Sequence, residues 1–168
     1  MDAKPARGDF VDRVRHGWAR NWPDLDVATV EVMGRITRIA ALTNQRVERD
    51  LAPVAVTRAE FDVLCTLARA DSPLRASDVT AATMLSGAST TKNAERLVQR
   101  CLVERLPWEL DGRVVLLQLT EQGRDLVNRE FPHFLERDSQ VLEGLSAKEQ
   151  VQLASLLRKV ALRAETVD

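Results

Sequence analysis

The chain has 168 residues, of which 45% are hydrophobic and 29% charged, with a formal net charge of −1. This composition is typical of a globular protein with one sizeable core, and the low aromatic content of 4%, with no Tyr, favours helices over a sheet sandwich. No apolar run approaches the ~18 residues of a membrane span, and residues 1–9 lack the apolar core of a signal peptide. We therefore expect a cytoplasmic protein without membrane contact, and the balanced charge does not by itself indicate a nucleic-acid partner.

Two helices are predicted in the first third of the chain. Phe10, Val14 and Trp18 recur at helical spacing, and Trp22-Pro23 ends this first segment. A second, longer helix carries the apolar stripe Val32, Ile36, Ile39, Val47 and Leu51. A chain this short cannot easily cover such a stripe, so we expect it to pack against a second copy of the chain. Packing of the stripe within one chain is the alternative.

A helix-turn-helix is predicted in the middle of the chain. Thr57-Arg-Ala-Glu60 fits a capping box and starts a helix that ends at Asp71-Ser72-Pro73. A short helix over residues 76–83 follows, and another begins after Ser86, a good N-cap, with its apolar face continuing to Cys101. Two helices joined by a turn as brief as Met84-Leu85 form a helix-turn-helix.

A β-hairpin is predicted next, because the apolar period changes beyond Arg100. Residues 102–106 and 114–119 are the expected strands, joined by a loop over residues 107–112. Arg113 at the tip is a predicted DNA contact, since a guanidinium on a thin hairpin can enter the narrow, negative minor groove. Asp111 is expected to hold Arg105 or Arg113 through a charge-assisted bond and so to position the wing.

The last third of the chain is predicted to be helical. Thr120 caps a helix that continues past Pro132, and the capping box Ser146-Ala-Lys-Glu149 begins the final helix. The final helix carries a second apolar stripe, formed by Leu153, Leu156, Leu157 and Val160. We expect this stripe, like the first, to take part in a dimer.

A helical wheel separates the faces of the helix that follows Ser86. With Leu97 inward and about 100° per residue, Thr90 and Ala94 also point inward. The outward positions are Ala88, Thr91, Lys92, Glu95 and Gln99. We predict that Ser89, Thr91 and Lys92 contact base edges and that Ser86 and Arg96 contact phosphates. The alternative is that these are solvated positions without a partner.

The order of these parts resembles the MarR family of bacterial winged-helix transcription regulators. The resemblance rests on a capped helix, a helix-turn-helix, a Leu-Val-Glu-Arg strand, an Asp-x-Arg wing and a Leu-Thr-x-x-Gly helix start, and is most specific over residues 97–123. Two departures are visible: Cys101 stands where glycine is usual, and a second arginine often found between Asp111 and Arg113 is missing.

The resemblance implies a mostly α fold with a small β-wing. Residues 1–50 would hold an added helix and the first dimerisation helix, residues 51–123 the winged helix-turn-helix domain, and residues 124–168 the C-terminal dimerisation helices. It further implies a homodimer in which each winged helix contacts one half of a near-palindromic, double-stranded DNA operator. Repression is the commoner outcome in the family.

The N-terminal segment HGWARNWPDLD, together with the later EFDVL, resembles the urate-responsive subgroup of this family. The resemblance implies that Trp18, Asp62 and Arg105 take part in ligand response. It also implies that the helix after Ser86 is the DNA-recognition helix, on which Asn93 replaces an arginine. Because asparagine cannot supply that charge, we expect another aromatic or anionic effector rather than urate. Asn93 lies near the inward face of the helix wheel, so its polar group needs a partner, and Asp62 is a candidate hydrogen-bond partner. Alternatively, Trp18 is a core or dimer-interface aromatic and Asp62 a solvated residue.

Other functions have weaker support in the sequence. Cys65 and Cys101 lack the paired spacing of a zinc site and are expected to be reduced, buried thiols, so a thiol redox-responsive regulator is a minor alternative. A winged helix that serves only protein contacts is a second alternative, which the balanced charge permits. His16 and His133 lie far apart in sequence and no glycine-rich phosphate loop follows a strand, so neither an enzyme nor a cofactor is expected.

Overall fold

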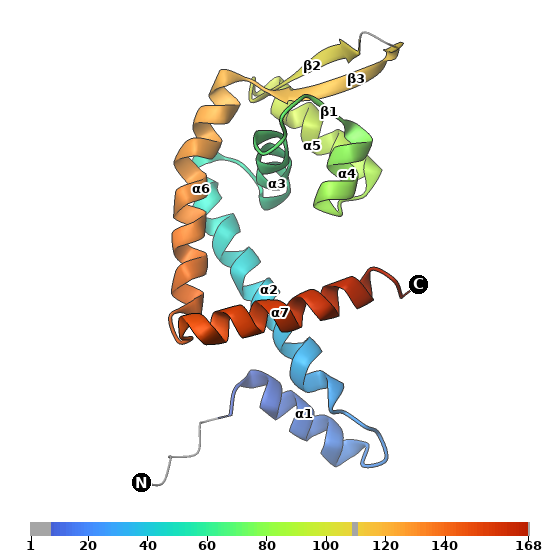
Figure 1. Ribbon diagram of the computed structural model, residues 1–168, viewed down its shortest axis with the longest axis vertical. Coiled ribbons are helices and arrows are strands. Elements are labelled where there is room, and N and C mark those ends of the chain that lie inside the picture. Colours follow the sequence, from blue (N-terminus) through green and yellow to red (C-terminus); the bar gives the residue numbers. More distant parts are fainter. Residues whose placement is uncertain (1–7, 109–110, 168) are drawn as a thin grey trace. The chain divides into compact units, whose positions relative to one another are not determined.

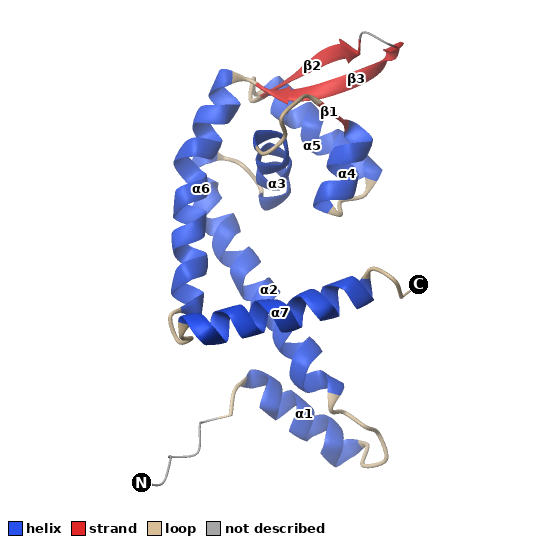
Figure 2. Cartoon of the chain, in the orientation of Figure 1, coloured by secondary structure: helices blue, strands red, loops and turns tan. Residues whose placement is uncertain are grey.

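The computed structural model describes residues 8–108 and 111–167, and for residues 111–113 the backbone alone. The chain forms two compact units, residues 1–58 and 59–168. The described residues are mostly helical, with one small antiparallel sheet, as Figures 1 and 2 show. The predicted class, mostly α with a small β-wing, is confirmed.

The first unit contains α1 (Phe10–Asn21), α2 (Thr29–Leu51) and the 3₁₀ turn η1 (Ala52–Val54). Asp9 caps α1, because its carboxylate accepts a hydrogen bond from the Asp12 N–H while the Asp12 carboxylate accepts one from the Asp9 N–H. The backbone N–H of Trp22 donates to the Trp18 carbonyl where α1 ends. The helix predicted from Phe10, Val14 and Trp18 is therefore confirmed.

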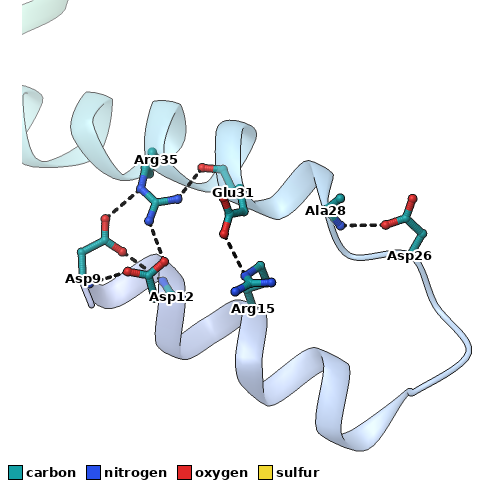
Figure 3. Close-up of polar contacts among 7 residues, drawn as sticks. All are labelled: Asp9, Asp12, Arg15, Asp26, Ala28, Glu31 and Arg35. Atoms are coloured by element: carbon teal, nitrogen blue, oxygen red, sulfur yellow. Dashed lines mark hydrogen bonds and ion pairs between the residues drawn. The ribbon is translucent and has the colours of Figure 1, made fainter. Parts of the chain in front are cut away.

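An ion-pair cluster joins α1 to α2 (Figure 3). The Arg35 guanidinium donates to the Asp9 carboxylate at 2.9 Å, to the Asp12 carboxylate at 2.7 Å and to the Glu31 carbonyl at 2.8 Å. Arg15 lies 3.0 Å from the Glu31 carboxylate. Hydrogen bonding to Arg35, followed by that to the Asp9 backbone, lowers the pKa of Asp12, and the same bond to Asp12 raises the pKa of Arg35.

The second unit contains the helix-turn-helix. Helix α3 (Arg58–Ala68) precedes it, β1 (Leu74–Arg75) leads into α4 (Ala76–Thr83), and α5 (Gly87–Gln99) follows the turn. The predicted bounds of α4 are confirmed, and Ser86 is the N-cap of α5. Met84, at the end of α4, adopts a left-handed conformation with φ 57°, which turns the chain sharply into α5. The core of this unit includes Phe61, Val63, Leu64, Leu67, Val79, Ala94, Leu97, Val103, Leu117 and Leu126.

Strands β1, β2 and β3 form a three-stranded antiparallel sheet of order β1-β3-β2, and its β2–β3 hairpin follows α5. Strand β2 covers Val103–Trp108 and β3 covers Asp111–Leu119, so the strands extend into the loop predicted over residues 107–112. The backbone pairing continues there because Trp108 pairs with Asp111 across a register shift at Pro107/Trp108. Strand β1 was not predicted: only two residues pair, Leu74 with Leu117 and Arg75 with Leu116.

Cys101 corrects the prediction for the end of the recognition helix. Helix α5 ends at Gln99, and Cys101 is an exposed residue with φ 57°, not a buried one on the helical face. Its N–H donates to the Val98 carbonyl and the Leu102 N–H donates to the Leu97 carbonyl, which is a Schellman motif. Cys65 is half-buried. The expectation of two buried thiols is therefore wrong, and the left-handed φ explains why glycine is usual at position 101.

Two long helices complete the second unit, α6 (Glu121–Leu142) and α7 (Ala147–Ala164). Thr120 caps α6 by accepting from the Gly123 N–H, and α6 continues through Pro132 as predicted. Ser146 and Glu149 form the predicted capping box of α7. Hydrogen bonding from Ser146 lowers the pKa of Glu149. Within the described part of the chain, no helix is long and apolar enough to cross a membrane.

Candidate nucleic-acid interface

The N-terminus of α5 is open to solvent and lined by small residues. Gly87 and Ala88 are both exposed in its first turn. The Ser86 hydroxyl accepts a hydrogen bond from the Ser89 N–H at 3.2 Å, which fixes the start of the helix. The unpaired N–H groups and the dipole of a helix N-terminus favour an anion, and small side chains let the backbone come close to it. This end of α5 is therefore suited to approach a phosphate backbone.

The two faces of α5 are divided as the helical wheel predicts. Thr90, Ala94 and Leu97 are buried, and Ala88, Thr91, Lys92, Glu95 and Gln99 are exposed. The Thr91 hydroxyl donates to the Gly87 carbonyl at 2.9 Å, so its oxygen remains available as an acceptor. Lys92 extends from the same exposed face as a donor. This face presents both donor and acceptor groups for base edges.

Polar contacts fix α5 against its neighbours. The Thr80 hydroxyl of α4 donates to the Thr90 hydroxyl of α5 at 2.9 Å. Within α5, the Asn93 amide donates to the Ser89 hydroxyl at 3.3 Å. Asn93 is buried, as its inward position predicts, and Asp62 on α3 is half-buried rather than solvated. The pairing of Asn93 with Asp62 stays a prediction, whereas its contact with Ser89 links it to a predicted base-contacting residue.

Two ion pairs among the described residues involve side chains of α5. Arg96 of α5 lies 3.9 Å from Glu60, a buried residue in the first turn of α3. Arg105 of β2 lies 3.8 Å from Glu95 on the exposed face of α5. The Arg105–Glu95 pair is exposed on both sides, and such pairs contribute about 0–1 kcal/mol to stability, so its main effect is on where the guanidinium group points. Glu95 also places a negative charge on the face predicted to meet DNA.

A cavity of about 250 Å³ lies between the wing and the helix-turn-helix. Thr91 and Ala94 of α5, Arg105 of β2 and Val115 of β3 line it, together with Ala76 and Leu117. The predicted base-contacting residue Thr91 and the predicted ligand-binding residue Arg105 therefore share one hollow. The side chains of Asp111 and Arg113, predicted to position the wing and to contact DNA, lie outside the described residues.

Two residues of this surface were missed by the sequence reasoning. Met84 is 93% exposed at the turn between α4 and α5, where its apolar side chain is open to a partner. Arg75 stacks over the Trp108 ring, with its guanidinium carbon 4.2 Å from the ring centroid. Met84 could have been found from the sequence, because a large apolar residue at a predicted turn indicates an exposed apolar side chain. No local pattern in the sequence links Arg75 to Trp108.

The residues predicted to bind a ligand are divided between the two units. Trp18 lies on α1, is 44% exposed, and packs against Trp22 with ring centroids 4.8 Å apart. Asp62, Asn93 and Arg105 belong to the second unit. Trp18 is thus not a core aromatic of its own unit. In the described residues, no group of His, Cys, Asp and Glu could hold a metal ion.

Comparison with known proteins identifies the family. A family model described as MarR family matches residues 56–114. The HTH-type transcriptional regulator PecS of Dickeya dadantii is 32% identical over 152 residues, which cover 89% of this chain and 92% of that protein. This chain belongs to the MarR family. Proteins of the MarR family are DNA-binding transcriptional regulators and not enzymes, so the helix-turn-helix and its wing form a DNA-binding module.

Solved structures of MarR-family proteins share the fold. The structure of AbsC from Streptomyces coelicolor matches with a TM-score of 0.75 at 23% identity and covers 85% of this chain and 99% of that one. The structure of Bordetella bronchiseptica BpsR, in a study of how 6-hydroxynicotinic acid regulates its DNA binding, matches with a TM-score of 0.68 at 31% identity. It covers 78% of this chain and 98% of BpsR.

Proposed function

We propose that this chain is a homodimeric repressor that binds a near-palindromic operator and is released by a small aromatic or anionic ligand. The exposed face of α5 carries this proposal. Its N-terminus, the Thr91 acceptor and the Lys92 donor are turned outward together, while polar and apolar contacts hold the opposite face in the core. A recognition helix needs this combination of a fixed frame and an open polar face.

Each predicted contact has a distinct role in the proposed complex. Ser89, Thr91 and Lys92 read base edges, whereas Ser86 and Arg96 bind phosphates and fix the register. Arg113 enters the minor groove, and Asp111 holds the wing in place. Because 24 Lys and Arg residues are balanced by 25 Asp and Glu residues, the chain has no general excess of positive charge to attract phosphates, and each cation placed at the interface carries a large share of the affinity.

The apolar stripes support a dimer. Leu153, Leu156, Leu157 and Val160 of α7 are each at least 37% exposed, and Val32 and Ile39 of α2 are each more than half exposed. Val47 and Leu51 of the predicted α2 stripe are instead buried within the chain, so only the first part of that stripe is open to a partner. Large contiguous apolar surfaces are uncommon on monomers and mark contacts with another chain. Two copies related by a twofold axis would also present two recognition helices to half-sites about one helical turn, ~34 Å, apart.

The ligand class is inferred from similar proteins and from residue chemistry. DNA binding by BpsR, which is 31% identical, is regulated by 6-hydroxynicotinic acid, an aromatic acid. In this chain, Arg105 can pair with an anion, Asn93 and Asp62 can hydrogen-bond ring substituents, and Trp18 can stack on a ring. Such a ligand acts only if it binds the DNA-competent and DNA-incompetent dimers with different affinity.

The DNA contacts can be tested by fluorescence anisotropy with a labelled operator fragment. Lys92→Ala and Arg113→Ala should each weaken operator binding about tenfold, which is the scale of one charge-assisted contact. Lys148→Ala, which removes an exposed lysine of α7, is the matched control and should bind as the parent chain does. Unchanged binding by both Lys92→Ala and Arg113→Ala would show that neither α5 nor the wing reads DNA as proposed.

The ligand response can be tested with the same operator complex. Nicotinic-acid derivatives and urate are added, and release of DNA is recorded for the parent chain and for Trp18→Ala. We expect Trp18→Ala to bind the operator normally and to need at least about tenfold more ligand for release, because it loses an aromatic stacking surface. Release of both proteins at the same ligand concentration would remove Trp18 from the site.

A further inference from the structure

Arg75 occupies a position that is unfavourable for a cation. It is the N-cap residue of α4, where Ser, Thr, Asp or Asn is preferred because an oxygen can accept from the first free N–H groups. A guanidinium has no acceptor, and a positive charge near a helix N-terminus opposes the helix dipole. The Asp78 carboxylate accepts from the Arg75 backbone N–H at 3.2 Å, which leaves the side chain to another role.

The Arg75 side chain reaches across the sheet to the wing. Its guanidinium carbon lies 4.2 Å from the centroid of the Trp108 ring. Arg75 pairs with Leu116 on the central strand β3, and Leu116 pairs with Leu106 on β2. Paired residues share one face of an antiparallel sheet. The Arg75 side chain therefore extends over β3, from the edge strand β1 to the edge strand β2. The contact thereby joins the N-cap residue of α4 to the last residue of β2.

Trp108 lies at the irregular part of the hairpin. The register of β2 and β3 shifts between Pro107 and Trp108, and Trp108 then pairs with Asp111. Such a shift bends a strand and increases its twist, so the direction of the hairpin beyond it is not set by regular pairing alone. A stacked cation from β1 supplies a further constraint at this point, and β1 is continuous with the helix-turn-helix.

We infer that Arg75 and Trp108 are positioning residues: their cation–π contact fixes the direction of the β2–β3 wing relative to α4 and α5, and so raises operator affinity without touching DNA. The inference rests on the proposed role of the wing in binding DNA. Arg75 is therefore not a phosphate contact, even though it is an exposed arginine in the DNA-binding unit.

The test is a double-mutant cycle on operator affinity, measured by anisotropy. Trp108→Ala and Arg75→Gln should each weaken binding about threefold, the scale of an exposed cation–π contact, and the double variant should bind no more weakly than either single one. Trp108→Phe keeps an aromatic face and should recover most of the affinity. Thermal unfolding midpoints of Arg75→Gln and the parent should agree closely, because the variant also removes the unfavourable cation at the start of α4.

Two results would overturn the inference. The first is normal operator binding by both Trp108→Ala and Arg75→Gln. The second is a double variant whose loss of binding free energy equals the sum of the two single losses, together with a weaker salt dependence for Arg75→Gln alone. The slope of log affinity against log salt concentration would then fall by about one unit, as expected for a lost phosphate contact.

Introducing Trp108→Ala into Arg113→Ala separates this inference from the proposed function. If the wing acts through Arg113, Trp108→Ala should cost nothing further in that background. If Arg113→Ala alone binds normally, the proposed contact of Arg113 is wrong, and a non-additive loss for Arg75 and Trp108 would still support their positioning role.

Discussion

Cys101 holds a backbone conformation that costs free energy. Its φ of 57° places it in the left-handed region, where a Cβ crowds the backbone at a cost of roughly 1–2 kcal/mol. The Schellman hydrogen bonds of Cys101 and Leu102 fix this conformation, and the Leu102 side chain is buried next to it. The Cys101 residue is exposed, so little packing offsets the cost.

Cys101→Gly should therefore stabilise the protein. Removing the Cβ relieves the strain, while the greater freedom of glycine in the unfolded chain cancels part of the gain, so we expect a net increase of about 0.5–1 kcal/mol in the free energy of unfolding. Urea denaturation measures this change. Cys101→Ala keeps a Cβ and should differ little from the parent. Equal stability of the glycine and alanine variants would contradict the strain argument.

At the level of single residues, burial and exposure were predicted where a regular helical period determines them. The exposure of Thr91 and Gln99 on α5 and the burial of Asn93 followed from the wheel because the helix is regular there. Cys101 was misplaced because the same period was extended past the end of the helix. The pairs Glu95–Arg105 and Arg75–Trp108 depend on how β1 and β2 pack against distant residues, which no local pattern contains.

The junction between the wing and α6 is built too tightly for any side chain at Gly123. A Cβ on this glycine would lie 2.0 Å from the Leu102 carbonyl oxygen, which belongs to the backbone and cannot move aside easily. The same carbonyl accepts from the Thr120 N–H, and the Thr120 hydroxyl donates to the Cys101 carbonyl. The glycine of the Leu-Thr-x-x-Gly pattern thus lets α6 begin directly against the end of the recognition helix.

Gly123→Ala should be strongly destabilising. Because backbone atoms must separate to make room, we expect a loss of about 3 kcal/mol in the free energy of unfolding, at the upper end for overpacking. Gly144→Ala is the matched control, since a Cβ there would meet nothing within 4 Å. Thermal and urea unfolding of the two variants gives the comparison. Similar stability for both would show that the contact at Leu102 relaxes without cost.

Acid should weaken the contact between α1 and α2. Arg35 holds the pKa of Asp12 below its ordinary value, so the folded state binds this proton less readily than the unfolded state. The stabilisation is therefore fully present above about pH 5 and is lost as the pH falls below about 4 towards the lowered pKa of Asp12.

Arg35→Gln should remove this pH dependence. The difference in unfolding midpoint between the parent and Arg35→Gln is expected to be largest near neutral pH and to shrink as the pH falls below about 4. In a carbon NMR titration, the pKa of Asp12 should rise towards its ordinary value in the variant. Arg20→Gln, which lies on α1 with Asp12, is the control and should leave the Asp12 titration unchanged. A difference that grows on acidification would refute the role given to Arg35.

Helices were predicted more fully than strands. Capping residues such as Ser86, Thr120 and Ser146 mark helix starts within three or four residues of sequence, and all three are N-caps in the structure. Strand β1 has two residues, and its identity depends on pairing with Leu116 and Leu117, more than 40 residues away. The extent of β2 and β3 likewise depends on cross-strand pairing rather than on local composition.

At the scale of the whole molecule, a single chain leaves many large apolar side chains exposed to solvent. None of the residues of α7 is buried, although the helix carries the stripe Leu153, Leu156, Leu157 and Val160. Helix propensity and a capping box favour α7, but most helical stability in proteins comes from burying an apolar face, and α7 buries no residue within this chain. The sequence predicted the stripe from its period, and its proposed partner is the same stripe or the α2 stripe of a second copy.

A charge placed in the α7 stripe should separate the proposed dimer. Leu156→Glu would bury an unpaired carboxylate in the proposed interface, so we expect monomers at micromolar concentration by sedimentation velocity and much weaker binding to a full operator. Ser155→Glu introduces the same charge about 100° around the helix from Leu156, away from the stripe, and should remain dimeric.

The weaker operator binding expected for Leu156→Glu follows from the loss of the second DNA-binding head, because each half-site is then bound by a separate monomer without the gain in effective concentration. The two proteins should therefore bind an isolated half-site equally and differ only on the full operator. A Leu156→Glu protein that stays dimeric would show that α7 lies outside the interface.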